Sequence, residues 1–384
     1  MMKVVYLLPG GLFNSGGMER VITVKANYLV EKAGIEVAIV TTEQMGRPVF
    51  YPLSDKVRLH HLNIGIHENF GKESYLQKCV SRYRKIKEYR QKLTTLLEQI
   101  RPDITISTLG LDIEFINDLK DGSVKIGELH FPGNFRELMA RKLSNDWLSN
   151  FIAQRRTIAL RKQCARLAQL VVLTHEEKSS WKNQHNISVI PNPLPFFPEQ
   201  TSPCTSKQAI AVGRLVYEKG FDQLIEVWEK FAANYPDWKL SIYGDGDQKD
   251  LLRQRIKDRG LEKQVKIYPP VVDIYAKYMD SSLLVFPSRY LDALPMVLIE
   301  ALSCGLPLVA FDAPCGPKDV IVNEENGFLV PAGDVNALSE KIQTLLASEA
   351  LRQTMGKAAR ASSERYRLEP VMDQWLNLFK QVNG

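Results

Sequence analysis

The hydrophobic positions of this chain fall into short unbroken runs that alternate with stretches of helical spacing. Residues 3–9 form a run of strand-favouring side chains without a helical period, and residues 18–30 then repeat their apolar positions as a helix does. The same order continues to residue 190 and starts again at residue 209. Repeated strand–helix order is typical of parallel sheets covered by helices. The pattern therefore predicts an α/β protein with two parallel-sheet domains.

The two blocks predict a definite series of elements. In the first block we expect strands at residues 3–9, 36–42, 57–62, 103–109, 124–129, 170–174 and 187–190, and helices at 18–30, 75–100, 111–119 and 148–167. In the second we expect strands at 209–213, 240–243, 265–268, 283–287 and 306–311, and helices at 221–234, 335–346 and 349–363. A turn at 326–330 leads into a short strand, and Asp334 is placed as a helix N-cap.

A break rich in Pro, Ser and Thr at residues 191–206 separates the blocks and is typical of an interdomain linker. The first domain is then residues 1–195 and the second 196–366. A final helix within 367–384 is long enough to leave the second domain and pack back on the first. Because parallel sheets bind ligands at the carboxyl ends of their strands, we expect the two domains to face a central cleft.

The stretch from Asp292 to Glu300 stands between a buried strand and a helix entered near Pro295, where the missing N–H has no partner to lose. The free N–H groups of such a helix start favour an anion. Two carboxylates eight residues apart would lie roughly 12 Å apart along a helix. This exceeds the roughly 5–9.5 Å of glycosidase pairs but suits the two ends of a nucleotide-sugar. Alternatively, Asp292 is a helix N-cap and Glu300 has no ligand, and this explains the stretch equally well.

Two cations follow the first strand of the second domain. Arg214 and Lys219 lie in a strand-to-helix loop and fit a diphosphate. The guanidinium of Arg214 can donate two parallel hydrogen bonds to a phosphate, and Lys219 acts as a point charge. The alternative is a pair of exposed surface cations. The nearby Asp245 and Asp247 could hold a divalent metal, but Asp247 directly precedes a helix, so N-capping is the simpler interpretation and no metal is expected.

The first domain offers a glycine loop and a histidine. Gly16 and Gly17 precede the helix at 18–30 and would let a phosphate approach the backbone, or simply form a flexible turn. His130 stands where the strand at 124–129 ends, the usual place for ligands of a parallel sheet. The alternative is a histidine packed under a loop.

The net charge of +6 is unevenly distributed. Residues 1–195 contain 28 Lys and Arg against 19 Asp and Glu, whereas residues 196–384 contain 22 against 25. The first domain is therefore the candidate for an anionic partner. Its helix at 75–100 carries a run of bases with interleaved apolar residues, namely Arg82, Tyr83, Arg84, Lys85, Ile86, Lys87, Tyr89, Arg90 and Lys92. Such a helix fits anionic lipid headgroups or is simply a solvated face.

Other classes of protein are disfavoured by the sequence. No apolar run reaches the length of a membrane span, and the first residues lack a signal-peptide pattern, so we expect a cytoplasmic protein. Five scattered cysteines without a Cys-x-x-Cys pair argue against disulfides or zinc. The sequence contains no helix-turn-helix and no basic ribbon with interleaved aromatic residues, so nucleic-acid binding is disfavoured.

Taken together, the motifs resemble those of retaining glycosyltransferases of family 4, which have the GT-B fold of two Rossmann-like domains. The resemblance runs along essentially the whole chain. It is carried by Gly16-Gly17-Met18-Glu19-Arg20, Glu128-Leu129-His130, Gly213-Arg214-Leu215, Lys219-Gly220, Tyr243-Gly244-Asp245-Gly246, Pro295-Met296-Val297-Leu298-Ile299-Glu300-Ala301 and Asn326-Gly327-Phe328-Leu329-Val330.

The resemblance implies a role for each matching residue. Glu300 would bind the ribose of the donor, and Arg214 and Lys219 its diphosphate. The chain around Leu294, Pro295, Met296 and Val297, together with Gly16 and Gly17, would help to hold phosphate and sugar. His130 and Asp292 would be the candidate catalytic residues beside the transferred sugar.

Two departures from the family pattern are visible. Relatives often carry Glu where this chain has Asp292, displaced by the extra Leu291, and Gly where it has Pro269-Pro270. The shorter acid alters the donor-sugar contact, and the prolines alter the loop beside the base.

The implied reaction is metal-independent transfer of a sugar from a UDP-sugar, with retention, to a glycan or lipid-linked glycan in bacterial surface polysaccharide synthesis. The acceptor would bind the basic first domain at the inner membrane face. A UDP-sugar 2-epimerase of similar architecture is the alternative enzyme. A two-domain solute-binding protein is a third class, but it would need export.

Overall fold

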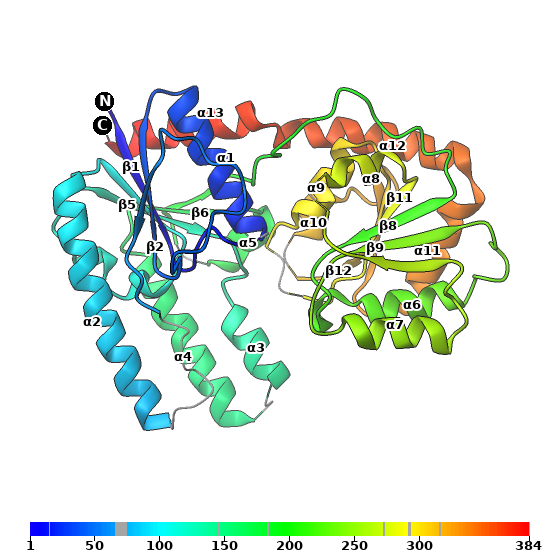
Figure 1. The fold of residues 1–384 in the computed structure, drawn as a ribbon, viewed down its shortest axis with the longest axis horizontal. Helices are drawn as coiled ribbons and strands as arrows, with labels where there is room; N and C mark the ends of the chain where they lie inside the picture. Colours follow the sequence, from blue (N-terminus) through cyan, green and yellow to red (C-terminus); the bar gives the residue numbers. More distant parts are fainter. Residues whose placement is uncertain are drawn as a thin grey trace. The chain divides into compact units, whose positions relative to one another are not determined.

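The computed structural model describes residues 1–14, 16–65, 75–143, 146–182, 184–271, 273–290, 293–314 and 316–383, with the side chains of 75–79 and 141–143 excepted. The chain divides into two compact units (Figure 1). Unit 1 is Met1–Pro195 with Glu369–Gly384, and unit 2 is Phe196–Leu368. Each unit is built around its own parallel sheet.

Unit 1 has a seven-stranded sheet in the order β3-β2-β1-β4-β5-β6-β7. Its strands are β1 Lys3–Leu8, β2 Glu36–Thr41, β3 Arg58–His61, β4 Ile104–Ser107, β5 Val124–Leu129, β6 Gln169–Val172 and β7 Ile187–Val189. Its helices are α1 Gly17–Glu31, α2 Tyr75–Ile100, α3 Phe135–Leu143, α4 Trp147–Cys164, α5 His175–Ser180 and, from the far end of the chain, α13 Leu368–Asn383. The inner strands β1 and β4 are almost continuously buried because helices cover them.

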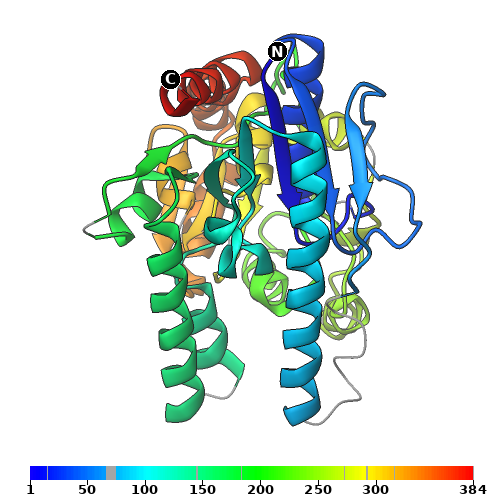
Figure 2. The same ribbon diagram turned by 90° about the vertical axis from the view of Figure 1, so that its left-hand side faces the viewer.

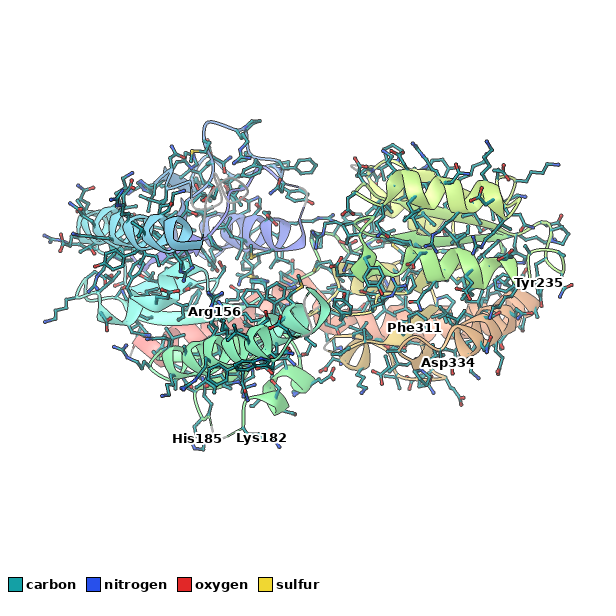
Figure 3. The ribbon with its side chains drawn as sticks, turned by 90° about the horizontal axis from the view of Figure 1, so that it is seen from below. Arg156, Lys182, His185, Tyr235, Phe311 and Asp334 are labelled. Atoms are coloured by element: carbon teal, nitrogen blue, oxygen red, sulfur yellow. The ribbon has the colours of Figure 1, made fainter. Side chains whose placement is uncertain are left out.

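Unit 2 has a six-stranded sheet in the order β10-β9-β8-β11-β12-β13. Its strands are β8 Gln208–Val212, β9 Lys239–Tyr243, β10 Val265–Tyr268, β11 Leu283–Phe286, β12 Leu308–Asp312 and β13 Gly327–Pro331. Its helices are α6 Phe221–Glu229, α7 Lys249–Asp258, α8 Ile274–Met279, α9 Met296–Ser303, α10 Pro317–Val320, α11 Val335–Ala347 and α12 Glu349–Ser363. Trp228 of α6 and Phe311 of β12, the latter labelled in Figure 3, belong to one buried core.

Most predicted elements are present to within a few residues, and α2 and α12 begin and end at the predicted residues. Asp334 caps α11 by accepting from the N–H groups of Asn336 and Ala337, as expected (Figure 3). The predicted helix at 111–119 is wrong. Two short 3-10 helices, Leu111–Glu114 and Ile116–Asp118, stand there, because Phe115 between them has a φ of −139°.

Other corrections concern helix lengths and omissions. Helix α6 ends at Glu229 rather than at residue 234. Helices α3 and α5 were not predicted at all. Helix α5 is six residues long and has no apolar period, and its start is fixed by Thr174, whose hydroxyl accepts the N–H of Glu177.

No helix among the described residues is long and apolar enough to cross a membrane.

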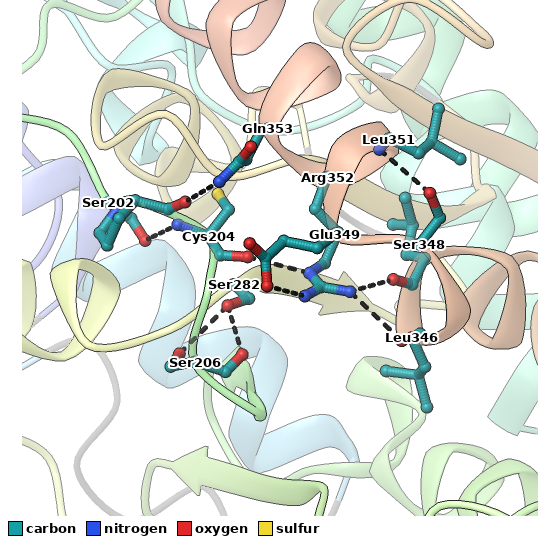
Figure 4. Close-up of polar contacts among 12 residues, drawn as sticks. Ser202, Cys204, Ser206, Ser282, Leu346, Ser348, Glu349, Leu351, Arg352 and Gln353 are labelled. Atoms are coloured by element: carbon teal, nitrogen blue, oxygen red, sulfur yellow. Dashed lines mark hydrogen bonds and ion pairs between the residues drawn. The ribbon is translucent and has the colours of Figure 1, made fainter.

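The segment that enters unit 2 is held by one buried arginine (Figure 4). Arg352 of α12 is 3 % exposed. Its Nε donates to the carbonyl of Cys204 at 3.0 Å, and its Nη1 donates to the carbonyls of Leu345 and Leu346 at 2.7 and 3.2 Å. One guanidinium thus satisfies the carbonyls at the end of α11 and joins them to the entering chain.

We expect Arg352→Ala to lower the free energy of unfolding by about 3 kcal/mol, because three buried carbonyls lose their donors. Urea denaturation monitored by circular dichroism measures this. The matched control is Arg253→Ala, which removes a 55 % exposed side chain from a helix of the same unit. Equal stability of the two variants would show that Arg352 does not fasten the segment.

Candidate functional site

The carboxyl edge of the unit 2 sheet has a point where the strand order reverses. Strand β8 pairs with β9 on one side and with β11 on the other, so the loops after β8 and β11 leave the sheet in opposite directions. This is where open parallel sheets bind ligands. The two loops that the sequence singled out, after residues 213 and 287, both start here.

The loop after β8 is packed directly against the backbone that follows β11. Gly220, at the start of α6, has a φ of +67°, and a Cβ there would lie 2.0 Å from the carbonyl oxygen of Pro287. Only glycine fits this contact without moving the main chain. The close approach fixes the height of the loop above the sheet edge.

This loop carries the two expected cations. Arg214 is exposed at its start. Lys219 is partly buried, and its Nζ lies 5.6 Å from the centre of the Phe286 ring at the end of β11. The loop therefore brings positive charge from β8 to the mouth of the neighbouring strand, as a diphosphate would require.

Arg289, which the sequence analysis did not single out, braces the same loop. Its guanidinium makes two 2.8 Å bonds to the carboxylate of Asp222 and a 2.6 Å bond to the carbonyl of Tyr217. Its own N–H donates to the carbonyl of Glu218 at 2.8 Å. Burial raises the pKa of Asp222, but Arg289 lowers it more, so this pKa lies below its usual value. Nothing local in the sequence pairs Arg289 with a residue 67 positions away.

Helix α9 begins beside this loop. Pro295 is its N-cap, so the helix is entered near Pro295 as expected. Leu294 and Pro295 are buried, whereas Met296 and Val297 are partly exposed. The first N–H groups of a helix have no partner within it, so this end can receive an anion. The loop before α10 packs on it, since a Cβ on Gly316 would lie 2.7 Å from Cδ of Pro295.

Glu300 lies one turn inside α9 and is only 2 % exposed. Its Oε2 accepts a hydrogen bond from the hydroxyl of Tyr278 at 3.2 Å. Burial, and then the charge of Glu300, raise the pKa of Tyr278 well above its usual value, so the phenol keeps its proton. Asp292 lies outside the described residues, and its spacing from Glu300 is therefore not measured.

The N-capping interpretation of Asp247 is wrong. Helix α7 has Gln248 as its N-cap, with no side-chain capping bond. Asp245 forms an ion pair with Lys249 at 3.1 Å instead. Across the described ranges, no group of three or more His, Cys, Asp or Glu side chains is placed to hold a metal ion.

In unit 1, the strand order reverses between β1 and β4, and β5 is the next strand. Gly16 is the N-cap of α1 and Gly17 its first residue, so the glycine pair and His130, which follows β5, lie at the same edge of the sheet. The His130 side chain is 5 % exposed, and its Nε2 lies 3.1 Å from Oε1 of Glu128.

The loop after His130 is held by α5, which the sequence analysis missed. One oxygen of Glu177 accepts the N–H of Gly133 at 2.9 Å and the indole N–H of Trp181 at 2.6 Å. The chain that leaves the His130 position is thereby fixed to a neighbouring helix.

Comparison with known proteins now adds to this geometry. Residues 195–362 match the family model "Glycosyl transferases group 1". Over these residues the chain is similar to this family of glycosyltransferases. The match covers almost all of unit 2, which carries the loop cations and α9.

Some curated proteins are similar to this chain along its whole length. The amylovoran biosynthesis glycosyltransferase AmsD of Erwinia amylovora is 29 % identical over 386 residues, 98 % of this chain and 99 % of the relative. The GalNAc-alpha-(1->4)-GalNAc-alpha-(1->3)-diNAcBac-PP-undecaprenol alpha-1,4-N-acetyl-D-galactosaminyltransferase of Campylobacter jejuni is 24 % identical over 390 residues and covers all of both chains.

A solved structure of a TarM mutant of S. aureus, in complex with fondaparinux, alpha-GlcNAc-glycerol and UDP, is also similar to this chain. Its TM-score is 0.77 at 18 % identity, with 99 % of this chain and 100 % of that chain covered. At this identity the likeness concerns the fold. The predicted fold class, GT-B with two parallel α/β domains, is confirmed.

We expect Arg289→Lys to lower the free energy of unfolding by about 2 kcal/mol, because lysine cannot make the paired bonds that hold the loop. Urea denaturation monitored by circular dichroism measures this.

The pKa of Asp222 is depressed, so the bonds between Arg289 and Asp222 are complete above the usual aspartate value of about 3.9 and are lost as the pH falls below it.

The matched control is Arg259→Lys, which alters a surface pair with Glu229 in the same unit. If both variants unfold at the same urea concentration as the unchanged protein, the paired bonds of Arg289 do not brace the loop.

Proposed function

We propose that this protein transfers a sugar from a nucleotide-sugar, of the UDP type, to a glycan or lipid-linked glycan in bacterial surface polysaccharide synthesis, with retention of the anomeric configuration. The observation that carries the proposal is that a cationic loop and a helix N-terminus follow β8 and β11, two strands that are neighbours in the sheet. A diphosphate with a sugar at one end and a nucleoside at the other suits this edge. Unit 2 is then the donor-binding domain and unit 1 the acceptor-binding domain.

Charge stabilisation is the main catalytic contribution in this proposal. Arg214, Lys219 and the N–H groups at the start of α9 meet the negative charge that develops on the diphosphate as it leaves. Glu300 binds the ribose hydroxyls, and the hydroxyl of Tyr278 already orients its carboxylate. No metal has a role in this scheme, because side chains and the helix end supply the positive charge. The UDP in the TarM structure supports a UDP-type donor.

The acceptor side of the proposal rests on unit 1. We propose His130 as a catalytic residue of this unit and Gly16 and Gly17 as residues that bind the donor. Asp292, which belongs to the second half of the sequence, is the other proposed catalytic residue. The attack is on the same face as the departing group, and the leaving phosphate takes the proton of the acceptor hydroxyl. The name of the Campylobacter relative, with its PP-undecaprenol-linked glycan, supports a lipid-linked acceptor.

We place the peripheral contact with the inner membrane face on the first turns of α4 and α2. Both helices extend past the carboxyl edge of the unit 1 sheet (Figure 2). The first turns of α4 expose four large apolar side chains, Trp147 at 79 %, Leu148 at 50 %, Phe151 at 49 % and Ile152 at 39 %. Bases follow one turn later at Arg155 and Arg156, the latter labelled in Figure 3, and the helix contains no acidic residue. Apolar side chains beside bases suit an anionic lipid surface.

Helix α2 contributes a smaller part of this surface than its sequence indicates. Val80 and Tyr83 are 51 % and 70 % exposed, and Arg84 and Lys87 are exposed near them. Tyr89, however, is fully buried in the core of unit 1. Two of the bases are neutralised within the protein, since Arg82 pairs with Glu114 and Lys92 pairs with Glu88.

The reaction is tested with a panel of nucleotide-sugars, first by protection against thermal unfolding and then by product analysis with and without a glycan acceptor. We expect UDP-sugar protection and an acceptor-dependent product. His130→Ala should lower turnover roughly a hundredfold with nearly unchanged UDP affinity, whereas Arg214→Ala and Lys219→Ala should lose UDP protection.

Lys207→Ala is the control for the two cation variants, because it removes an exposed lysine from the same unit. A sugar product formed without acceptor would indicate an epimerase instead. Full turnover of His130→Ala would remove this residue from the mechanism.

The membrane contact is tested by co-sedimentation with vesicles containing phosphatidylglycerol. Replacing both Trp147 and Phe151 with Ser should weaken binding roughly tenfold, because apolar area is no longer buried in the lipid. Added salt should weaken it further. Phe50→Ser is the control, since this ring of unit 1 is 51 % exposed. Binding that ignores both salt and the double substitution would contradict the proposal.

A further inference from the structure

Three ionisable side chains are packed together inside unit 1, at the end of the strand that leads to His130. Lys25 of α1 and Glu128 of β5 are 0 % and 2 % exposed. The Nζ of Lys25 lies 2.7 Å from each of the two carboxylate oxygens of Glu128. One of these oxygens, Oε1, also lies 3.1 Å from Nε2 of His130. The carboxylate is therefore shared between a cation and the candidate catalytic ring.

Aromatic rings complete the surroundings of this cluster. The Nζ of Lys25 lies 3.5 Å from the ring centre of Trp375 in α13 and 5.3 Å from that of Tyr6 in β1. Aromatic faces stabilise a buried ammonium without neutralising it. The charged or titratable groups that face Glu128 are thus Lys25 from α1, His130 from the end of β5 and Tyr6 from β1.

Both members of the pair are charged at neutral pH. Burial raises the pKa of Glu128, but Lys25 and His130 lower it more, to about 2. Burial lowers the pKa of Lys25 to about 8, although Glu128 opposes this shift. A completely buried ion pair is a poor way to stabilise a fold, since apolar residues of similar size do as well or better. This points to a role beyond packing.

The position of His130 indicates what that role is. Its Nε2 is buried, and no hydrogen bond of good geometry reaches it, although Oε1 of Glu128 lies at 3.1 Å. A carboxylate facing one ring nitrogen of a histidine keeps a proton there and fixes the tautomer and orientation of the ring.

We propose that Glu128, paired with Lys25, is a positioning residue that keeps a proton on Nε2 of His130 and leaves Nδ1 as the ring nitrogen available to a bound sugar. This inference rests on the proposed role of His130 in sugar transfer. Lys25 holds the carboxylate in place, and Trp375 ties the returning helix α13 to the same cluster.

The test compares Glu128→Gln, His130→Ala and the double variant of both, with kcat and KM measured from about pH 5 to pH 8. Glu128→Gln should lower kcat roughly tenfold and shift the pH profile of kcat, with unchanged protection by UDP. The double variant should be no slower than His130→Ala alone, because Glu128 acts through His130.

Two further variants separate positioning from folding. Glu128→Gln leaves Lys25 buried without a counter-charge, so a double change of Lys25→Met and Glu128→Gln removes both charges together. It should recover thermal stability but not kcat. Asp121→Asn is the matched control, because it breaks a partly buried ion pair. In this pair Asp121 contacts Lys125, which lies near the start of β5. This variant should leave the pH profile unchanged.

The failures of the two proposals are distinguishable. If His130→Ala retains full turnover, the proposed role of His130 is wrong and the inference is overturned with it. If His130→Ala is slow but Glu128→Gln keeps its kcat and pH profile, only the inference is overturned. A loss in the Glu128–His130 double variant equal to the product of the two separate losses would likewise overturn it.

Discussion

The contact between Gly220 and the carbonyl of Pro287 is the constraint on which the unit 2 site depends. It exists because β8 and β11 are neighbours although the residues they pair, Ala209 and Leu283, are far apart in sequence. The approach leaves no room for a side chain, so the cationic loop and the chain entering α9 are held at one height. Arg289 fastens this arrangement through four bonds to the loop and to α6. Main-chain packing therefore positions the site, and the bonds of Arg289 then fasten it.

Unit 1 uses a different device at its own sheet edge. Its charges are buried instead of exposed, and each is compensated within a few ångströms by an opposite charge or an aromatic face. Burial makes these interactions strong and directional, because little water screens them. The two units thus offer different chemistry. Unit 2 has the cations of a loop and a helix N-terminus at its sheet edge, whereas unit 1 has a buried ion pair next to His130.

The sequence predicted much of this and missed particular parts for physical reasons. The long amphipathic helices and the apolar strands were found, because each has a local period that one segment is enough to show. Helix α5 was missed because it has no apolar period and depends on a cap and on the bonds of Glu177. Helix α3 was missed because its nine residues make only about two and a half turns. The candidate residues Arg214, Lys219 and Glu300 came from their positions beside predicted strands and helices and from motif resemblance, whereas Arg289, Glu177 and Lys25 had no local signal.

By itself, the sequence determined most of the element types, the break between the two blocks, the excess of bases in the first block and the resemblance to glycosyltransferases. Tertiary structure decided which of the many charges meet. The Lys25–Glu128 pair joins residues 103 positions apart, and Arg289 reaches back 67 positions to Asp222. Hydrophobic spacing reports only which face of a segment is buried, while strand order and loop packing decide what that face touches. Side chains separated in this way become neighbours only when the sheet has assembled.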